Sequence, residues 1–232
     1  MSSPYDAIAE LYDPWSASVV EDVAFYLEEA RRSGGPVVEL GVGTGRIAVP
    51  IAADGTRVIG IDSSRGMLDV CARRAALAGV ELDLRVGDLL EPPVRERVPL
   101  VICPFRSLLH LHTDEDRRRA LAAVRELLVP GGRFVFDVFT PGAEDIAQTH
   151  DRWLEREPGI FERAVWDEEG RTLTLTVRGE AGETTMALAW LPPDEWRALL
   201  EVSGFEIEAC YGWFDRRPFA GGEDTVWIAR CP

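Results

Sequence analysis

The sequence predicts an α/β protein in which helices pack on both faces of a mostly parallel sheet. Apolar strand-like runs alternate with amphipathic helix-like runs from residue 36 to about residue 139, the pattern of strands joined by crossover helices. Near the start of this region, an apolar run leads into three closely spaced glycines and then into a helix. Such a turn lets a ligand lie against the main chain beside free helix N–H groups, so it points to a nucleotide-like cofactor.

The individual elements follow from the spacing of apolar residues and turn residues. We expect strands at residues 36–41, 56–61, 81–87, 98–103 and 132–139. We expect the intervening helices at residues 44–54, 64–79 and 114–129. The last of these helices opens with Asp114, Glu115 and Asp116, whose charges complement the positive end of the helix dipole.

The segments that flank this region have other patterns. Residues 5–32 read as two helical segments broken at Pro14. Residues 159–190 alternate polar and apolar side chains around a tight polar turn at 167–170. This pattern predicts antiparallel strands at 160–166, 171–177 and 183–191.

The end of the chain predicts one more helix and two more strands. They lie at residues 193–203, 205–213 and 224–231. We therefore expect a single domain over residues 1–232, with a helical N-terminal part at 1–35 and an antiparallel insertion at 140–191.

The charge of the chain limits its partners. Forty acidic residues outnumber 25 basic ones, all of them arginines, and the formal net charge is −15. A protein that binds the phosphates of RNA or DNA is expected to have a basic face. We therefore expect no nucleic-acid partner, and the lack of lysine excludes a Schiff-base mechanism.

Cysteine, histidine and hydropathy patterns favour a cytoplasmic protein without a metal. The four cysteines form no CxxC pair, and the three histidines are not spaced with them as zinc ligands. Reduced thiols fit a reducing compartment. No apolar run reaches about 18 residues, and the N-terminus has no signal-like segment, so we expect no membrane partner.

The spacing of the glycine turn separates two classes of nucleotide cofactor. Residues 37–47 read VVELGVGTGRI, with Glu39 two residues ahead of the first glycine. In a dinucleotide fingerprint, a third glycine or alanine stands five positions after the first, where the helix packs closely on the strand. Here that position is Arg46, which argues against a dinucleotide.

Three further motifs follow in order. The second strand ends in Asp62, whose carboxylate can accept hydrogen bonds from two ribose hydroxyls, or can cap the next helix. Residues 84–90 read LRVGDLL, and residues 129–137 read VPGGRFVFD. Together with the glycine turn, these motifs resemble the class I S-adenosylmethionine-dependent methyltransferases, and the resemblance covers residues 37–139.

The resemblance implies a Rossmann-like three-layer sandwich with a seven-stranded, mostly parallel sheet whose last strand is antiparallel. It also implies that the N-terminal helices form a lid over the cofactor. S-adenosylmethionine would be the cofactor, and the reaction would be an in-line methyl transfer in which positioning is the main catalytic effect.

By the same resemblance, the glycine turn holds the amino acid end of the cofactor. The main chain at Gly41, Gly43 and Gly45 would pass under it, with Glu39 near that end. Arg46 would pair with the methionine carboxylate, or it is an exposed helix arginine.

The adenosine end would meet the second and third strands. Asp62 and the adjacent Ser63 would hold the ribose, and Met67 would pack on the adenosine or belong to the helix core. Asp88 would accept from the adenine amino group, or cap the next turn, while Leu89 supplies a backbone N–H.

Aromatic and carbonyl groups complete the implied site. The carbonyl of Cys103 would face the cofactor ammonium, and the ring of Phe105 would line the site, where its face favours a nearby cation. Tyr12 would reach the pocket from the lid with Tyr5 and Trp15, or these rings only pack the lid.

His110 is the residue that we nominate as a general base, because its usual pKa suits proton removal at neutral pH. It lies in SLLHL at residues 107–111. This is similar to the Ser-x-x-His-Leu segment of methyltransferases that dimethylate amino groups on nucleotide-linked sugars. A structural histidine beneath the loop is the alternative.

We therefore expect a methyltransferase that acts on a nitrogen or oxygen of a small-molecule acceptor, with a homodimer left open. Two other hypotheses remain: a nicotinamide-dependent oxidoreductase, and a subunit that binds S-adenosylmethionine without transferring its methyl group. No residue pattern distinguishes an amine from a hydroxyl, a carboxylate or a carbon acceptor.

Overall fold

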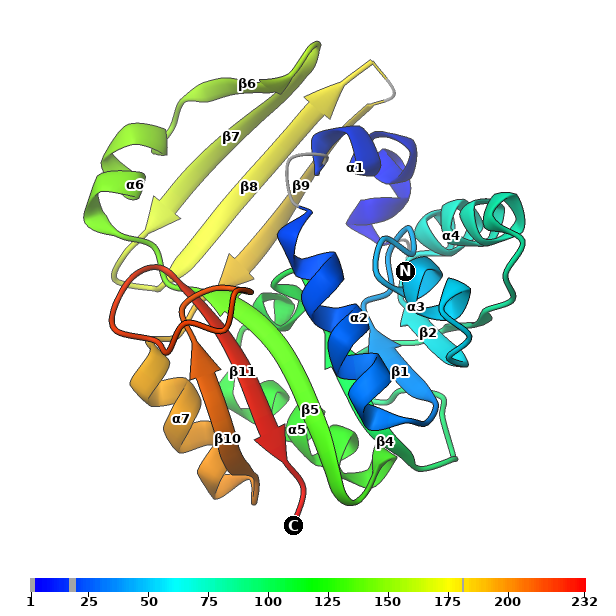
Figure 1. Ribbon diagram of the computed structural model, residues 1–232. Coiled ribbons are helices and arrows are strands. Elements are labelled where there is room, and N and C mark those ends of the chain that lie inside the picture. The colour runs from blue at the N-terminus through cyan, green and yellow to red at the C-terminus, as the bar shows by residue number, and fades with distance from the viewer. Residues whose placement is uncertain (1–2, 17–19, 181) are drawn as a thin grey trace.

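Two β-sheets organise the structure, a seven-stranded sheet and a four-stranded antiparallel sheet above it (Figure 1). The computed structural model describes residues 3–16, 20–180 and 182–232. The first two helical segments, η1 Pro4–Ile8 and α1 Ala9–Trp15, lie beside the smaller sheet, above the carboxyl ends of the central strands (Figure 1).

The large sheet has the strand order β10-β11-β5-β4-β1-β2-β3. Its strands are β1 Val37–Leu40, β2 Val58–Asp62, β3 Asp83–Val86, β4 Val98–Cys103, β5 Leu128–Phe139, β10 Glu206–Tyr211 and β11 Asp224–Arg230. Strand β11 runs opposite to the other six strands, and is antiparallel to both β10 and β5. The expected seven-stranded, mostly parallel sheet with an antiparallel last strand is confirmed.

Strand β5 begins at Leu128, earlier than the expected start at residue 132. Leu128 pairs with Val98, and the register with β4 then shifts before Arg133 pairs with Leu100. The Pro-Gly-Gly turn is thus a bulge inside the strand, with Gly131 in the left-handed region at φ 77°. A turn signal in sequence does not reveal that pairing resumes on both sides of it.

Helices cover both faces of this sheet. They are α2 Glu21–Ser33, α3 Ala48–Ala53 and α4 Arg65–Ala78 on one face, and α5 Asp114–Leu127 and α7 Pro193–Val202 on the other. The central strands are apolar on both sides as a result: in β4, Leu100 and Ile102 pack with the first group, and Val101 packs with the second.

The lid consists of the 3-10 helix η1 Pro4–Ile8 and helix α1 Ala9–Trp15. Helix α1 ends one residue after Pro14, close to the expected break. Asp6 accepts hydrogen bonds from Ser64 Oγ at 2.6 Å and Gly66 N at 3.0 Å on α4. Thr184 Oγ1 of the small sheet donates to the carbonyl of Pro4 at 2.7 Å, so the lid bridges both sheets.

The insertion forms the small sheet. It contains α6 Ala143–Thr149, β6 Trp153–Glu157, β7 Ile160–Asp167, β8 Thr172–Gly179 and β9 Gly182–Ala189. The expected hairpin and third strand correspond to β7, β8 and β9, whereas the sequence did not predict β6 or α6. Alternate residues of β8, such as Leu173 and Leu175, are buried against the main core.

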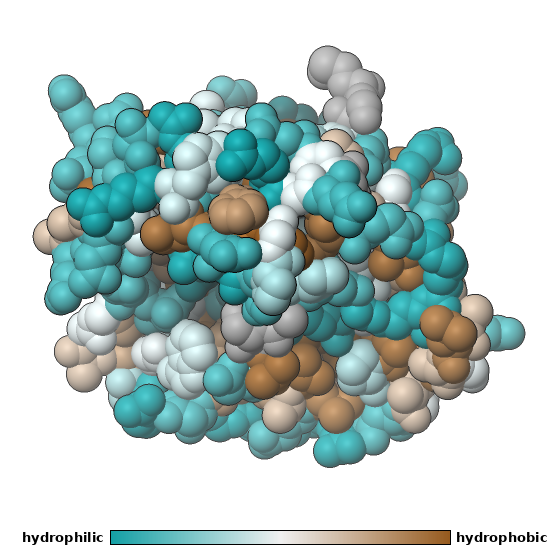
Figure 2. All heavy atoms as spheres, turned by 90° about the horizontal axis from the view of Figure 1, so that it is seen from above, coloured by the Kyte–Doolittle hydropathy of each residue, from teal (hydrophilic) through white to brown (hydrophobic). Residues whose placement is uncertain are grey.

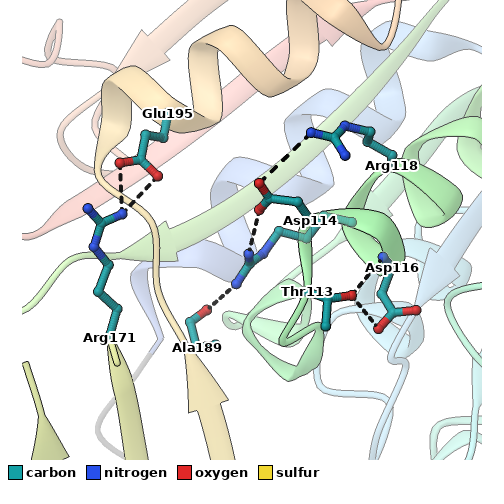
Figure 3. A network of polar contacts seen from close by, with 8 residues as sticks. Thr113, Asp114, Asp116, Arg118, Arg171, Ala189 and Glu195 are labelled. Atoms are coloured by element: carbon teal, nitrogen blue, oxygen red, sulfur yellow. Dashed lines mark hydrogen bonds and ion pairs between the residues drawn. The ribbon is translucent and has the colours of Figure 1, made fainter. Parts of the chain in front are cut away.

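Polar contacts fix the insertion to two helices of the large sheet (Figure 3). Arg117 of α5 reaches the carbonyl of Ala189 at the end of β9, at 3.4 Å. Arg171, before β8, donates to both carboxylate oxygens of Glu195 on α7 at 2.7 and 2.8 Å. Thr113 caps the start of α5. The N-terminal part of α5 is therefore hydrogen-bonded both within itself and to the insertion.

The outer face over the lid and insertion is mostly polar, with apolar side chains visible in the recesses between polar ones (Figure 2). Among the described residues, no helix is long and apolar enough to cross a lipid bilayer.

Candidate active site

A cavity of about 780 Å³ lies between the large sheet, the lid and the insertion, within the range of small-molecule sites. We call its wall at the large sheet the strand end; it includes Gly41, Gly43, Asp62, Met67, Asp88 and Leu89. The opposite wall, the insertion end, includes Ala164, Trp166, Leu173, Leu175, Met186 and Leu188. Tyr5, Tyr12, Phe105 and His110 also line the cavity.

The glycine turn forms the floor of the strand end. Gly43 lies in the left-handed region at φ 54°, and the nearest atom to a Cβ built there is 3.9 Å away, so its main chain is open to a ligand. Gly45, at φ 80°, has a different reason: a Cβ would approach Cys71 Sγ to 2.6 Å. Gly45 is not part of the cavity wall, and it allows the turn to pack against α4.

Asp62 is fixed at the end of β2 by main-chain donors. Its Oδ2 accepts from Gly43 N at 2.9 Å and its Oδ1 from Ser64 N at 2.8 Å. Burial is the main cause of the raised pKa of this carboxyl. Ser64, not Asp62, caps α4, because Ser64 Oγ accepts from Met67 N at 3.1 Å. Each carboxylate oxygen retains a second lone pair that can face the cavity, where Ser63 also lies.

The loop after β3 brings Asp88 and Leu89 to the cavity. Asp88 Oδ1 accepts from Leu90 N at 2.8 Å and Glu91 N at 2.9 Å, so this exposed carboxylate caps a turn and also lines the cavity. Met67 is buried in α4 and lines the cavity as well. A structural role, as turn cap for Asp88 and as helix core for Met67, is therefore compatible with a place in the cavity wall for each residue.

Arg46 lies outside the cavity wall. Its guanidinium binds both carboxylate oxygens of Asp22 on α2, at 2.5 and 2.6 Å, and lies 5.0 Å from the ring centroid of Phe105. The side chain is only 18% exposed, so the interpretation as an exposed helix arginine is wrong. Asp22, the partner of Arg46, lies in α2, outside the glycine motif. The motif alone therefore could not reveal this ion pair.

Glu39 lies beneath the turn as a fully buried carboxyl. Among the described residues, no hydrogen-bond partner reaches its Oε2. Burial raises the pKa of Glu39 well above its ordinary range, and the nearby Arg46 only partly opposes this. A buried carboxyl oxygen without a partner is costly, and Glu39 is not among the residues that line the cavity.

The loop after β4 has a strained turn. Cys103 ends the strand fully buried, and Phe105 and Arg106 both take left-handed conformations at φ 54° and 63°. Asp137 of β5 accepts from Phe105 N at 2.9 Å, Arg106 N at 3.1 Å and Tyr26 OH at 2.6 Å. Burial raises the pKa of Asp137 to about 6.

Asp137 was missed in the sequence analysis. The signal was present, because an acidic residue inside the apolar run FVFDVF is expected to be buried and hydrogen-bonded. The two main-chain donors were not predictable, since they depend on the unusual conformation of the turn.

His110 meets the lid inside the cavity. Its Nε2 is 2.9 Å from Tyr5 OH. Burial lowers the pKa of His110 to about 4, so the imidazole is neutral at physiological pH, and burial also raises the pKa of Tyr5, which remains a phenol. Tyr12 packs edge-on against Tyr5 and Phe105 at centroid distances of 5.9 and 6.2 Å.

The insertion end includes Trp166, one of the tryptophans of the insertion, together with Leu173 and Leu188. Its apolar wall comes from the inward positions of β7, β8 and β9, a set that strand alternation could have identified. Trp15 of the lid closes this end, and its Nε1 donates to Glu162 Oε2 of β7 at 2.9 Å.

A parallel sheet with a glycine turn after β1 and acids after β2 and β3 defines an α/β protein with a nucleotide-cofactor site at its carboxyl edge. The family model described as a methyltransferase domain matches residues 37–132. A dTDP-4-amino-2,3,4,6-tetradeoxy-D-glucose N,N-dimethyltransferase of Saccharopolyspora spinosa is 28% identical, over 88% of this chain and 84% of its own length.

Two solved structures are also similar. The CcbJ methyltransferase of Streptomyces caelestis has a TM-score of 0.79 at 28% identity, over 94% of this chain and 98% of that one. The S-adenosylmethionine-bound CalS10, an amino pentose methyltransferase of Micromonospora echinaspora, has a TM-score of 0.63 at 21% identity, over 100% and 92% of the two chains. Residues 37–132 thus match a methyltransferase domain, and the whole fold is similar to those of S-adenosylmethionine-dependent methyltransferases.

Proposed function

We propose that this methyltransferase methylates an amine nitrogen of a small molecule that is enclosed between the strand end and the insertion end. The observation that carries the choice of nitrogen is the His110–Tyr5 pair. A hydroxyl needs a base that removes its proton, and a histidine whose pKa is lowered to about 4 is a weak one. A neutral amine already has a reactive lone pair. Two relatives named for amino-sugar substrates support the same choice.

The strand end suits S-adenosylmethionine. Its main chain is open at Gly43, and Asp62, Asp88 and Leu89 line the same cavity. We propose that Asp62 accepts from the ribose hydroxyls and that Asp88 and Leu89 flank the adenine. When bound, the cofactor supplies an electrophilic methyl group on a sulfonium and leaves as a neutral thioether.

The chain contributes positioning. We propose that Tyr5 OH and His110 hydrogen-bond to the acceptor amine and direct its lone pair toward the methyl group. Such positioning can lower the activation barrier by at most about 7–11 kcal/mol. His110 then acts through contact with the acceptor, and not as the general base that the sequence analysis nominates. The lid ring of Tyr12 packs edge-on against Tyr5 beside this contact.

The test is product analysis with cofactor that is ¹³C-labelled at the methyl group. Matched pairs of alicyclic amines and alcohols are incubated with the enzyme, and the shift of the labelled methyl identifies the atom that received it. We expect N-methyl products. O-methyl products, or no transfer to any amine, would overturn the proposal.

A matched variant tests the role of His110. His110→Ala should lower kcat with the amine by at least about tenfold while the affinity for S-adenosylhomocysteine is retained, because only the acceptor contact is lost. His112→Ala is the control, since His112 is exposed and its ring bonds to the carbonyl of Ala187. Equal rates for the His110→Ala variant and the wild type would contradict this role.

A further inference from the structure

The insertion end of the cavity has an unusual balance of charge. Besides its apolar wall, four carboxylates line it, at Asp145, Glu157, Glu162 and Glu223. Only two arginines line the cavity among the described residues, Arg106 and Arg156. The six residues outside the described ranges have no basic side chain.

Both arginines already have acidic partners. Arg156 donates from Nε and Nη2 to Glu162 Oε1 at 3.1 and 2.8 Å. Arg106 pairs with Asp224 at 2.9 Å, and its guanidinium lies 4.5 Å from the ring centroid of Phe139. A phosphate that used either arginine would have to displace a carboxylate.

Three of the four carboxylates form no ion pair with a described residue. Within the described part of the chain, no arginine or histidine lies within ion-pair distance of Asp145, Glu157 or Glu223. Among the described residues, the carboxylate of Glu223 accepts one hydrogen bond, from Gly142 N at 3.1 Å. The potential at this end is therefore negative, and it repels anionic groups while it attracts cations.

The apolar wall adds a second requirement. Leu173 and Leu188 are paired across β8 and β9, as are Leu175 and Met186, so their side chains form a continuous surface. All four are at least nine-tenths buried yet reach the cavity. Such a surface fits the hydrocarbon face of a ring and offers no hydrogen bonds to phosphate oxygens.

We propose that the acceptor is a phosphate-free amine, cationic in solution, with an apolar ring or chain, and that nucleoside diphosphate-linked amines are poor substrates. This inference rests on the proposed amine methylation. It also separates this chain from its relative that is named for a dTDP-linked amino sugar.

The chemical step balances without another reactant. The ammonium gives its proton to solvent water before its nitrogen is enclosed beside the His110–Tyr5 pair, so the amine that reacts there is neutral. The freed nitrogen lone pair forms the new N–C bond while the C–S bond breaks, and that electron pair stays on the sulfur. A second round requires the methylated nitrogen to lose a proton in the same way.

The experiment uses one amine in two forms. trans-4-Aminocyclohexanol and its thymidine diphosphate ester are titrated into the full-length enzyme saturated with S-adenosylhomocysteine. We expect the free amine to bind at least about tenfold more tightly than the ester, with a difference that shrinks as salt is added. Equal or tighter binding of the ester, or no binding of the free amine, would overturn the inference.

Charge variants link the preference to these residues. The double variant Glu157→Gln with Glu223→Gln should weaken binding of the free amine by about three- to tenfold. The difference in affinity between the free amine and the ester should become smaller. Glu201→Gln, a matched change at an exposed site on α7 outside the cavity, should leave both affinities unchanged. An unchanged gap in the double variant would contradict the assignment to these carboxylates.

Product analysis on the same two probes keeps the two proposals distinguishable. If the ester is N-methylated faster than the free amine, the inference about phosphate fails and amine methylation stands. If the free amine binds but the label appears on its hydroxyl oxygen, the proposed function fails and the charge preference stands.

Discussion

At the scale of single residues, the buried carboxylate of Asp137 holds a strained turn that leads to the cavity. Two consecutive left-handed residues, Phe105 and Arg106, cost about 1–3 kcal/mol each, and Asp137 offsets this by accepting both of their N–H groups. The same turn leads into η2 Ser107–His110. Asp137 therefore acts as a positioning residue for His110, although it does not line the cavity.

We expect Asp137→Ala to release this turn. The free energy of unfolding should fall by about 2–4 kcal/mol because two main-chain donors lose their acceptor, and kcat/KM for the acceptor should fall more than the affinity for S-adenosylhomocysteine. Tyr26→Phe removes the third hydrogen bond to Asp137 but leaves the turn, so it should cost about 1 kcal/mol and spare the kinetics. Equal kinetic effects of the two variants would contradict a positioning role.

The lowered pKa of His110 predicts a pH dependence of stability. The unfolded chain, with a histidine pKa near 6.5, binds a proton that the folded chain does not take up until about pH 4. Folding stability from this residue is therefore present above pH 6.5 and is lost as the pH falls. Between pH 7 and 5, the wild type should lose up to about 2 kcal/mol relative to His110→Gln, as measured by urea unfolding. Parallel pH profiles would contradict the burial of a neutral imidazole.

At the scale of elements, the sequence predicts the helices and strands in which apolar residues recur at a regular spacing. The central strands and α4 and α5 lie within a few residues of their expected positions, because buried parallel strands read as apolar runs. Strand β6 and helix α6 were missed: α6 has no buried residue and β6 is mostly exposed, so neither shows a clear apolar period. The Arg46–Asp22 pair was missed for another reason, since it joins elements far apart in the chain.

The lid and insertion form one wall of the acceptor site through the Trp15–Glu162 hydrogen bond. We expect Trp15→Phe to raise KM for the acceptor by about three- to tenfold, because the donor is lost and the wall loosens. Cofactor affinity should not change.

Trp153→Phe is the matched control, as Trp153 is an exposed residue of β6 that stacks on Arg178 outside the cavity. Initial-rate kinetics for the two variants provide the comparison. A larger effect of Trp153→Phe would contradict the assignment of the wall.

At the scale of the whole molecule, the fold divides the work between its two sheets. The large sheet presents a cofactor site at its carboxyl edge, as open α/β sheets do. The small sheet and the lid supply the acceptor wall, and its acidic, apolar character agrees with a chain of net charge −15. The cofactor could be predicted because its binding follows local motifs. The acceptor could not, because its site is built from side chains of separate segments.

Calorimetric titration of S-adenosylhomocysteine into the wild type and an Asp62→Ala variant tests most directly that the strand end is the cofactor site. We expect the wild type to bind one S-adenosylhomocysteine per chain. The variant should bind it at least about tenfold more weakly, because two ribose hydrogen bonds are lost. Neither protein should bind NADH. Circular dichroism confirms that the variant is folded, which matters because Asp62 also holds Gly43 N. Equal affinity of a folded variant, or no binding by the wild type, would contradict the assignment.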